Sequence, residues 1–170
     1  MRMHDHAPPA SGSETPEPTA RPTAFVGRRL LALSYDAFPV LALWMAVAVP
    51  FALADVALSG DPRHNIGPFS TMQWLLWAAC WMVTGAYAVQ SWRRGGQTLG
   101  MRPWRLRVVA ADGGPATTLA SCVRVAVGTL SLLAGGLGFW WAWVDRERLA
   151  WHDRASRTRL VRIEKKTRSS

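Results

Sequence analysis

Three long stretches without a charged residue constrain the fold of this chain more than any other feature. They cover residues 37–54, 65–92 and 125–144, which are 18, 28 and 20 residues long. A helix needs about 20 mainly apolar residues to cross a bilayer core of about 30 Å. The alternative is a soluble bundle with three buried helices, but such helices usually keep a polar face, and these stretches have almost none. The sequence therefore predicts an all-α integral membrane protein.

The first two stretches predict full transmembrane helices, over about residues 29–53 and 71–92. Pro39 and Pro50 interrupt the first of them. Each proline frees the backbone carbonyl four residues before it, and in a membrane such a carbonyl needs another partner. We therefore expect an irregular backbone near Tyr35, the residue whose carbonyl Pro39 frees.

The third apolar segment covers about residues 118–149 and contains Gly135 and Gly136 near its middle. Glycine permits a tight turn, so the segment can form a helical hairpin from residues 118–134 and 137–149. A single straight span has the better length. The hairpin is favoured because it returns the strongly basic C-terminal tail to the side from which it entered.

The arginines set the expected orientation in the membrane. The net charge is +9, and 18 of the 20 basic side chains are arginines. Arginines stand at 21, 28 and 29, at 93, 94, 102, 105, 107 and 124, and at seven positions from 146 onward, whereas the loop between the first two spans has only Arg63. Cytoplasmic loops are enriched in basic residues, so the N-terminus, the second loop and the C-terminus are expected in the cytoplasm. Besides the bilayer, anionic lipid head groups are then expected partners, and nucleic acid is not.

Composition divides the chain into three regions. Residues 1–24 contain five prolines among Ser, Thr, Gly and Glu, which predicts a disordered tail. Residues 25–163 form the predicted membrane domain, and residues 164–170 a basic C-terminal tail. Two short segments in the membrane domain, 105–110 and 159–163, alternate like strands, and we expect them to pair. That pairing requires both segments to lie on one side of the membrane, and the alternative is two solvated basic loops.

The sequence offers no metal, cofactor or catalytic motif. The two histidines of the N-terminal tail are expected to bind no metal, and Cys80 and Cys122 are too far apart for a CxxC pair. Ser34 or Ser121 with His152 has no supporting motif. The glycines near residue 96 lack the lysine of a phosphate-binding loop. We therefore expect no cofactor and no enzymatic activity.

Asp36 stands out because it opens the first apolar stretch. Arg29 precedes it by seven residues, about two helical turns, which places both on nearly one face and roughly 10 Å apart. An ionisable group at the edge of a membrane span is costly, and it is a functional-site hypothesis by default.

Three motifs resemble those of the RDD family of membrane proteins. They are residues 27–36 (Gly-Arg-Arg-Leu-Leu-Ala-Leu-Ser-Tyr-Asp), residues 96–102 followed by 106–109 and 112–114, and residues 151–154 with Thr158. The resemblance covers about residues 25–163. It assigns the arginine and two aspartates of the family name to Arg29, with adjacent Arg28 as the alternative, and to Asp36 and Asp153. A glycine common before the final threonine is replaced here by Ser156-Arg157.

The resemblance implies a small multi-pass protein of the cell membrane, here the bacterial inner membrane, and transport of unspecified ligands. In one hypothesis, Asp36 binds an ion or proton near the cytoplasmic face and Arg29 adjusts its affinity. In the other, the charges form a packing clasp in a structural or assembly partner of a membrane complex, where Asp153 caps a short helix. A homo-oligomer or another membrane protein is a possible partner. The secondary candidates are Arg28, Gln97, Thr98, Gly100, Arg124 and His152.

Overall fold

The computed structural model describes residues 25–61 and 65–163, and they are mostly helical. In chain order the elements are α1 (Val26–Ser59), α2 (Thr71–Gly95), β1 (Leu106–Ala110), α3 (Thr118–Leu133), α4 (Leu137–Val144), α5 (Trp151–Ala155) and β2 (Thr158–Arg162). The predicted N-terminal and C-terminal tails, residues 1–24 and 164–170, lie outside the described residues.

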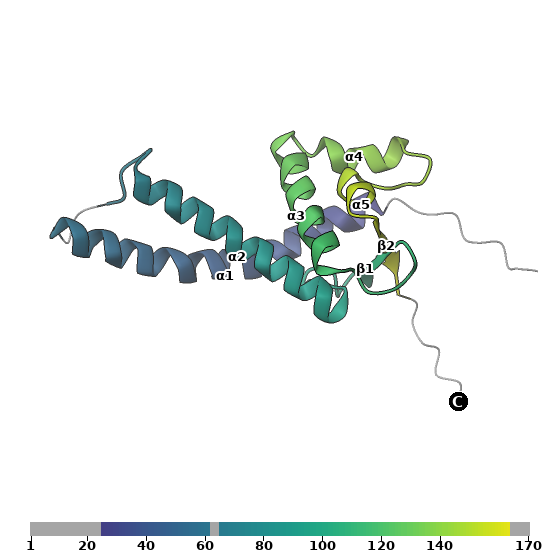
Figure 1. Ribbon diagram of the computed structural model, residues 1–170, viewed down its shortest axis with the longest axis horizontal. Coiled ribbons are helices and arrows are strands. Elements are labelled where there is room, and N and C mark those ends of the chain that lie inside the picture. The colour runs from purple at the N-terminus through teal and green to yellow at the C-terminus, as the bar shows by residue number, and fades with distance from the viewer. Residues whose placement is uncertain (1–24, 62–64, 164–170) are drawn as a thin grey trace, which may run out of the picture.

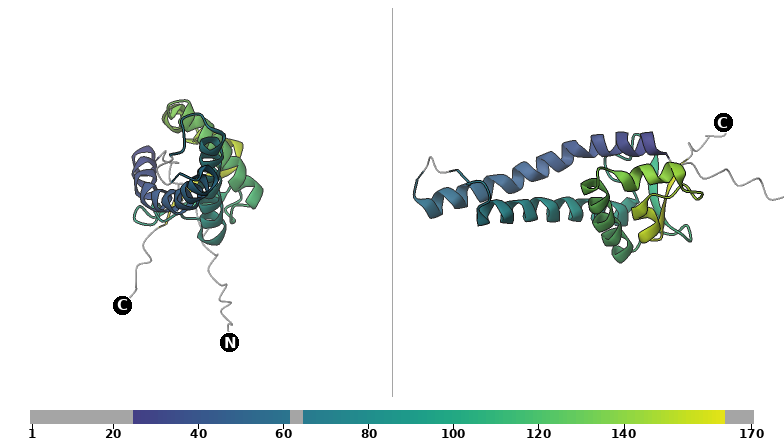
Figure 2. Two further views of the ribbon diagram at one scale, coloured as in Figure 1. Left: turned by 90° about the vertical axis from the view of Figure 1, so that its left-hand side faces the viewer. Right: turned by 90° about the horizontal axis from the view of Figure 1, so that it is seen from above.

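Helices α1 and α2 lie side by side and extend away from the remaining elements, which gather at one end of this pair (Figures 1 and 2). Near the middle of the pair, Trp44 Nε1 donates a hydrogen bond of 2.8 Å to Thr84 Oγ1. The Trp44 ring also meets the Trp81 ring edge to face, with centroids 6.4 Å apart. These contacts bind the two helices together inside the long, otherwise apolar section.

Helix α1 is longer and more regular than expected. It continues through Pro39 and Pro50 without a break, so the prediction of an irregular backbone near Tyr35 is wrong. Each proline removes one backbone hydrogen bond, and the bonds on either side hold the helix together. The helix ends only where Gly60 adopts a left-handed conformation, with φ 70°, and its N–H bonds the carbonyl of Val56.

Helix α1 is also long and apolar enough to cross a membrane. Its mean hydropathy reaches 2.1 over 18 residues, and none of that stretch is buried within the described protein. Among the described residues the same criterion selects no other single helix, but α3 and α4 pass it together as one bent pair. The crossing by residues 71–92 in α2 therefore stays a prediction.

The glycine break in the third apolar segment is confirmed, but the angle differs from that of a hairpin. Gly135 and Gly136 have φ angles of 68° and 80°, a conformation that favours glycine. The two helices meet at 98° instead of folding back antiparallel. Helix α4 also ends at Val144, before the expected residue 149. Gly138 of α4 lies against Ser131 of α3, and an added Cβ would come within 2.9 Å of the serine Cβ, so glycine permits this close approach of the two helices.

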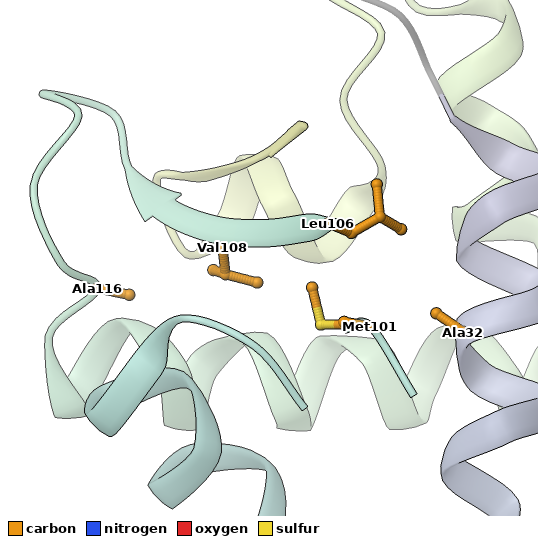
Figure 3. Packing of buried hydrophobic residues seen from close by; sticks show 5 residues of the cluster. All are labelled: Ala32, Met101, Leu106, Val108 and Ala116. Atoms are coloured by element: carbon orange, nitrogen blue, oxygen red, sulfur yellow. The ribbon is translucent and has the colours of Figure 1, made fainter. Parts of the chain in front are cut away.

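The predicted strand pair is confirmed. Strands β1 and β2 are antiparallel, with Val108 opposite Leu160 at the centre of the register. The main core lies where this ribbon meets α1 and the start of α3 (Figure 3). Its buried members are Ala32, Met101, Leu106, Val108 and Ala116. A second small cluster of Val26, Ala142 and Ala150 joins α1, α4 and the start of α5.

Candidate functional site

The carboxylate of Asp153 is fully buried between two arginines from different helices. Arg29 Nη1 on α1 lies 2.6 Å from Asp153 Oδ2, and Arg124 Nη1 on α3 lies 2.5 Å from Asp153 Oδ1. The backbone N–H of Ala150 donates to Oδ2 at 3.1 Å. Asp153 therefore caps the start of α5, as expected, while its charge joins α1, α3 and α5. We call Arg29, Arg124 and Asp153 the Asp153 clasp.

The arginines determine the charge state of this cluster. Burial by itself raises the pKa of Asp153, but Arg124, Arg29, His152 and the N–H of Ala150 together hold it below its ordinary value. Burial lowers the pKa of His152 to about 3, and the neighbouring Arg124 adds to this effect. At neutral pH the aspartate is therefore ionised and the histidine neutral.

Arg124 carries further contacts that connect the clasp to the C-terminal strand. Its Nη1 donates to Thr158 Oγ1 at 2.7 Å, and its guanidinium lies over the Trp92 ring, 5.3 Å from the centroid. Thr158 Oγ1 is also 2.7 Å from the hydroxyl of Ser156. Between them, Arg157 has a φ of 51°. This left-handed conformation explains why a glycine suits that position in the motif that the chain resembles.

Asp36 has a different environment. Its Oδ1 accepts hydrogen bonds of 2.8 Å from the Tyr87 hydroxyl and from the Gly100 N–H, and its Oδ2 accepts one of 2.5 Å from Thr98 Oγ1. Gly100 lies so close to α1 that an added Cβ would come within 2.6 Å of the Asp36 nitrogen. We call Asp36, Tyr87, Thr98 and Gly100 the Asp36 anchor, because they fasten the loop between α2 and β1 to α1.

The structure thus brings together only part of the predicted site. Arg29 meets Asp153, and within residues 25–61 and 65–163 no ion pair joins either of them to Asp36. Arg28 points elsewhere, with its guanidinium 5.7 Å from the centroid of the Phe25 ring. Of the remaining secondary candidates, four contact one of the two aspartates and Gln97 contacts neither. Thr98 and Gly100 contact Asp36, Arg124 and His152 surround Asp153, and Gln97 donates to the carbonyl of Leu106 at 2.6 Å.

Sequence reasoning missed two contributors. Tyr87 was hidden among the aromatic residues of α2, although a phenol in a long apolar helix usually needs a hydrogen-bond partner. Trp92 stands at the end of the second apolar stretch, and its ring supports the guanidinium of Arg124.

Members of both groups, but not Asp153 or Gly100, line one cavity of about 200 Å³ that is partly open to the outside. Arg29, Asp36, Arg124 and His152 contribute to its wall, and most of the remaining lining is apolar. No group of three His, Cys, Asp or Glu side chains that could hold a metal ion occurs in the part of the chain that the structure describes. The arrangement is therefore suited to small ligands, to protons, or to holding helices together.

A family model described as the RDD family matches residues 23–157. No curated protein and no solved structure matches the chain. The matched region contains every residue of the Asp153 clasp and of the Asp36 anchor, whereas Thr158, which accepts a hydrogen bond from Arg124, lies one residue beyond it.

Proposed function

The chain belongs to the RDD family, and on that premise we propose that it is a small multi-pass membrane protein with a structural or assembly role, in which the Asp153 clasp holds the helices together. The observation that carries this proposal is the Asp153 carboxylate, whose exposed fraction is zero and which has a guanidinium on each oxygen. A charge that is paired so completely within the protein is suited to fixing the packing of helices.

The strand pair supports a topology with both ends of the described chain on one side of the membrane. Strand β1 follows α2, and β2 follows α5, so the α3–α4 segment begins and ends on the same side. Arg29, near the start of α1, reaches Asp153 at that same end. With α1 and α2 as the proposed spans, the basic residues of this end favour a cytoplasmic location for it under the positive-inside rule.

The clasp is tested by a double-mutant cycle. Asp153→Asn and Arg124→Met are each expected to reduce the fraction of folded, monodisperse protein in detergent, because each leaves a buried charge without its partner. The double variant is expected to lose less stability than the sum of the losses in the two single variants. Additive losses would contradict a role for this pair in packing.

A second candidate function is ion- or proton-coupled transport through Asp36. The observation that favours it is the position of Asp36 on the wall of the shared cavity, where neutral donors surround its carboxylate. Asp36→Asn is then expected to insert and fold but to lose flux in proteoliposomes loaded with a pH-sensitive dye. Unchanged flux, or the absence of flux in the parent protein, would exclude this function.

A further inference from the structure

Two residues that line the shared cavity each have a buried ring nitrogen without a hydrogen-bond partner among the described residues. These nitrogens are Trp92 Nε1 on α2 and His152 Nδ1 on α5. An indole N–H can only donate. A buried donor without an acceptor costs about 1–3 kcal/mol, so its presence at a cavity calls for an explanation.

The free nitrogen of His152 is also a donor. Its Nε2 lies 3.4 Å from Arg29 Nη1, and a guanidinium has no acceptor atom, so Nε2 must present its lone pair. The proton of the neutral ring then resides on Nδ1. The ring is fixed in this place by Phe139, whose centroid is 4.7 Å away.

Arg124 adds more donors at the same wall. All of its hydrogen bonds and ion pairs within the described residues come from one nitrogen, Nη1. Its Nε and Nη2 groups form no hydrogen bond with another described residue. Three side chains from α2, α3 and α5 therefore offer donors to one cavity.

The rest of the cavity is mostly apolar. Its lining includes Leu33 and Val40 from α1, Trp81 from α2, and Val125 and Leu132 from α3. Asp36 also lines the cavity, but it accepts three hydrogen bonds and lies about two turns along α1 from Arg29, roughly 10 Å away. The cavity thus has a donor-rich end and an apolar remainder that is partly open to the outside.

We propose that this cavity binds an anionic amphiphile, with a carboxylate or phosphate head that accepts hydrogen bonds from Arg124, His152 and Trp92 and an alkyl chain among the apolar side chains of α1, α2 and α3. A free fatty acid and an anionic phospholipid both have this chemistry. The site would give a membrane protein of this size a specific lipid ligand, whether its role is structural or transport.

The ligand class is tested by the thermal unfolding of the full chain in dodecyl maltoside micelles, whose detergent has no anionic group. Sodium palmitate or dioleoylphosphatidylglycerol is expected to raise the midpoint, because a ligand that binds only the folded state stabilises it. Hexadecanol, with the same chain as palmitate but no oxyanion, and inorganic phosphate, with no chain, are expected to leave it unchanged. A response to palmitate alone identifies a free carboxylate amphiphile, and a response to the phospholipid identifies a membrane lipid. The proposal is overturned if hexadecanol raises the unfolding midpoint as strongly as palmitate and dioleoylphosphatidylglycerol do.

The site is tested by a pair of matched tryptophan variants. Trp92→Phe keeps an aromatic ring and removes the indole N–H, so we expect the apparent affinity for the active amphiphile to fall roughly tenfold or more. Trp104 Nε1 is also buried without a partner, but Trp104 does not line the cavity, so Trp104→Phe is expected to leave the affinity unchanged. Equal effects of the two variants would place the ligand elsewhere.

A third variant blocks the apolar part of the site. Gly128 lines the cavity, and an added Cβ would meet no atom within 4 Å, so Gly128→Phe is expected to fold. It should abolish the response to the amphiphile while the unfolding midpoint without ligand is kept. Binding that survives in this variant would contradict the proposed position of the alkyl chain.

None of these measurements depends on the double-mutant cycle at Asp153 or on flux, so the proposal of an amphiphile site can fail separately from the two proposed functions.

Discussion

The two aspartates of this chain occupy regions that differ in what neutralises them. Asp153 is fully buried, and an arginine reaches each of its oxygens from a separate helix. Asp36 is partly exposed, and its partners are the hydroxyls of Tyr87 and Thr98 and the N–H of Gly100. The same residue type therefore serves the fold in two ways. In the clasp, ion pairs join helices far apart in sequence, whereas in the anchor neutral donors fasten a loop to a helix.

The largest expected effect is at the clasp. Asp153→Asn removes the charge between Arg29 and Arg124, and breaking a buried pair in this way costs about 3–5 kcal/mol. We expect a corresponding loss in the free energy of unfolding, measured by thermal or denaturant unfolding in detergent. The control is Glu147→Gln, because Glu147 is 67% exposed and 3.4 Å from Arg154, so its loss should change stability by less than about 0.5 kcal/mol. Equal effects of the two variants would remove the distinction between the clasp and an ordinary surface pair.

Acid should affect the clasp through His152. Because the folded protein holds the pKa of this histidine near 3 while the unfolded chain has its ordinary value near 6.5, the unfolded state binds more protons between these values. Stability should therefore fall as the pH falls through this window, by up to about 1.4 kcal/mol per pH unit. From the ordinary aspartate value near 3.8 downward, Asp153, whose pKa is also lowered, should add a further loss because the unfolded chain takes up its proton first. Unfolding midpoints measured from pH 7 to pH 4 should show the slope in the parent protein and a smaller slope in His152→Gln.

The anchor should respond more weakly and more locally. Asp36→Asn replaces charge-assisted hydrogen bonds, which are worth about 1.5–3 kcal/mol, and its amide cannot accept from Thr98 and Gly100 as the carboxylate does. We expect faster hydrogen exchange in residues 96–105 and little change in α5. Ser34→Ala on the same helix is the control, because the Ser34 hydroxyl bonds only the carbonyl of Leu30 within the described chain. Exchange that rises throughout the molecule would show that the two regions form one cooperative unit.

The smallest expected effect is a gain in stability at Arg157, which lies between α5 and β2. Arg157 has a φ of 51°, which costs an L-residue roughly 1 kcal/mol, so Arg157→Gly should raise the unfolding midpoint slightly. Arg162→Gly in β2 is the comparison, because glycine weakens a strand and should lower the midpoint. A loss in both variants would mean that the Arg157 side chain contributes more than its backbone strain costs.

Local patterns predicted the elements well where they depend on neighbouring residues. The alternation at 105–110 and 159–163 and the glycines at 135 and 136 led to the observed strand pair and helix break. The proline rule failed near Tyr35, because one lost hydrogen bond does not break a helix supported on both sides. The angle of 98° between α3 and α4 could not be derived from the sequence, since it depends on the surfaces against which both helices pack.

The candidate site was predicted only in part for the same reason. The sequence by itself determined the long apolar helix and singled out Arg29, Asp36 and Asp153, because segment hydropathy and motif spacing are properties of the chain. Only the tertiary structure decided which donors meet each aspartate. It gave Asp153 two arginines, including Arg124, and left Asp36 to Tyr87, Thr98 and Gly100. The physical reason is that hydrogen bonds and ion pairs act over about 3 Å, whereas these partners are separated by tens of residues or more, so the packing of the helices selects them.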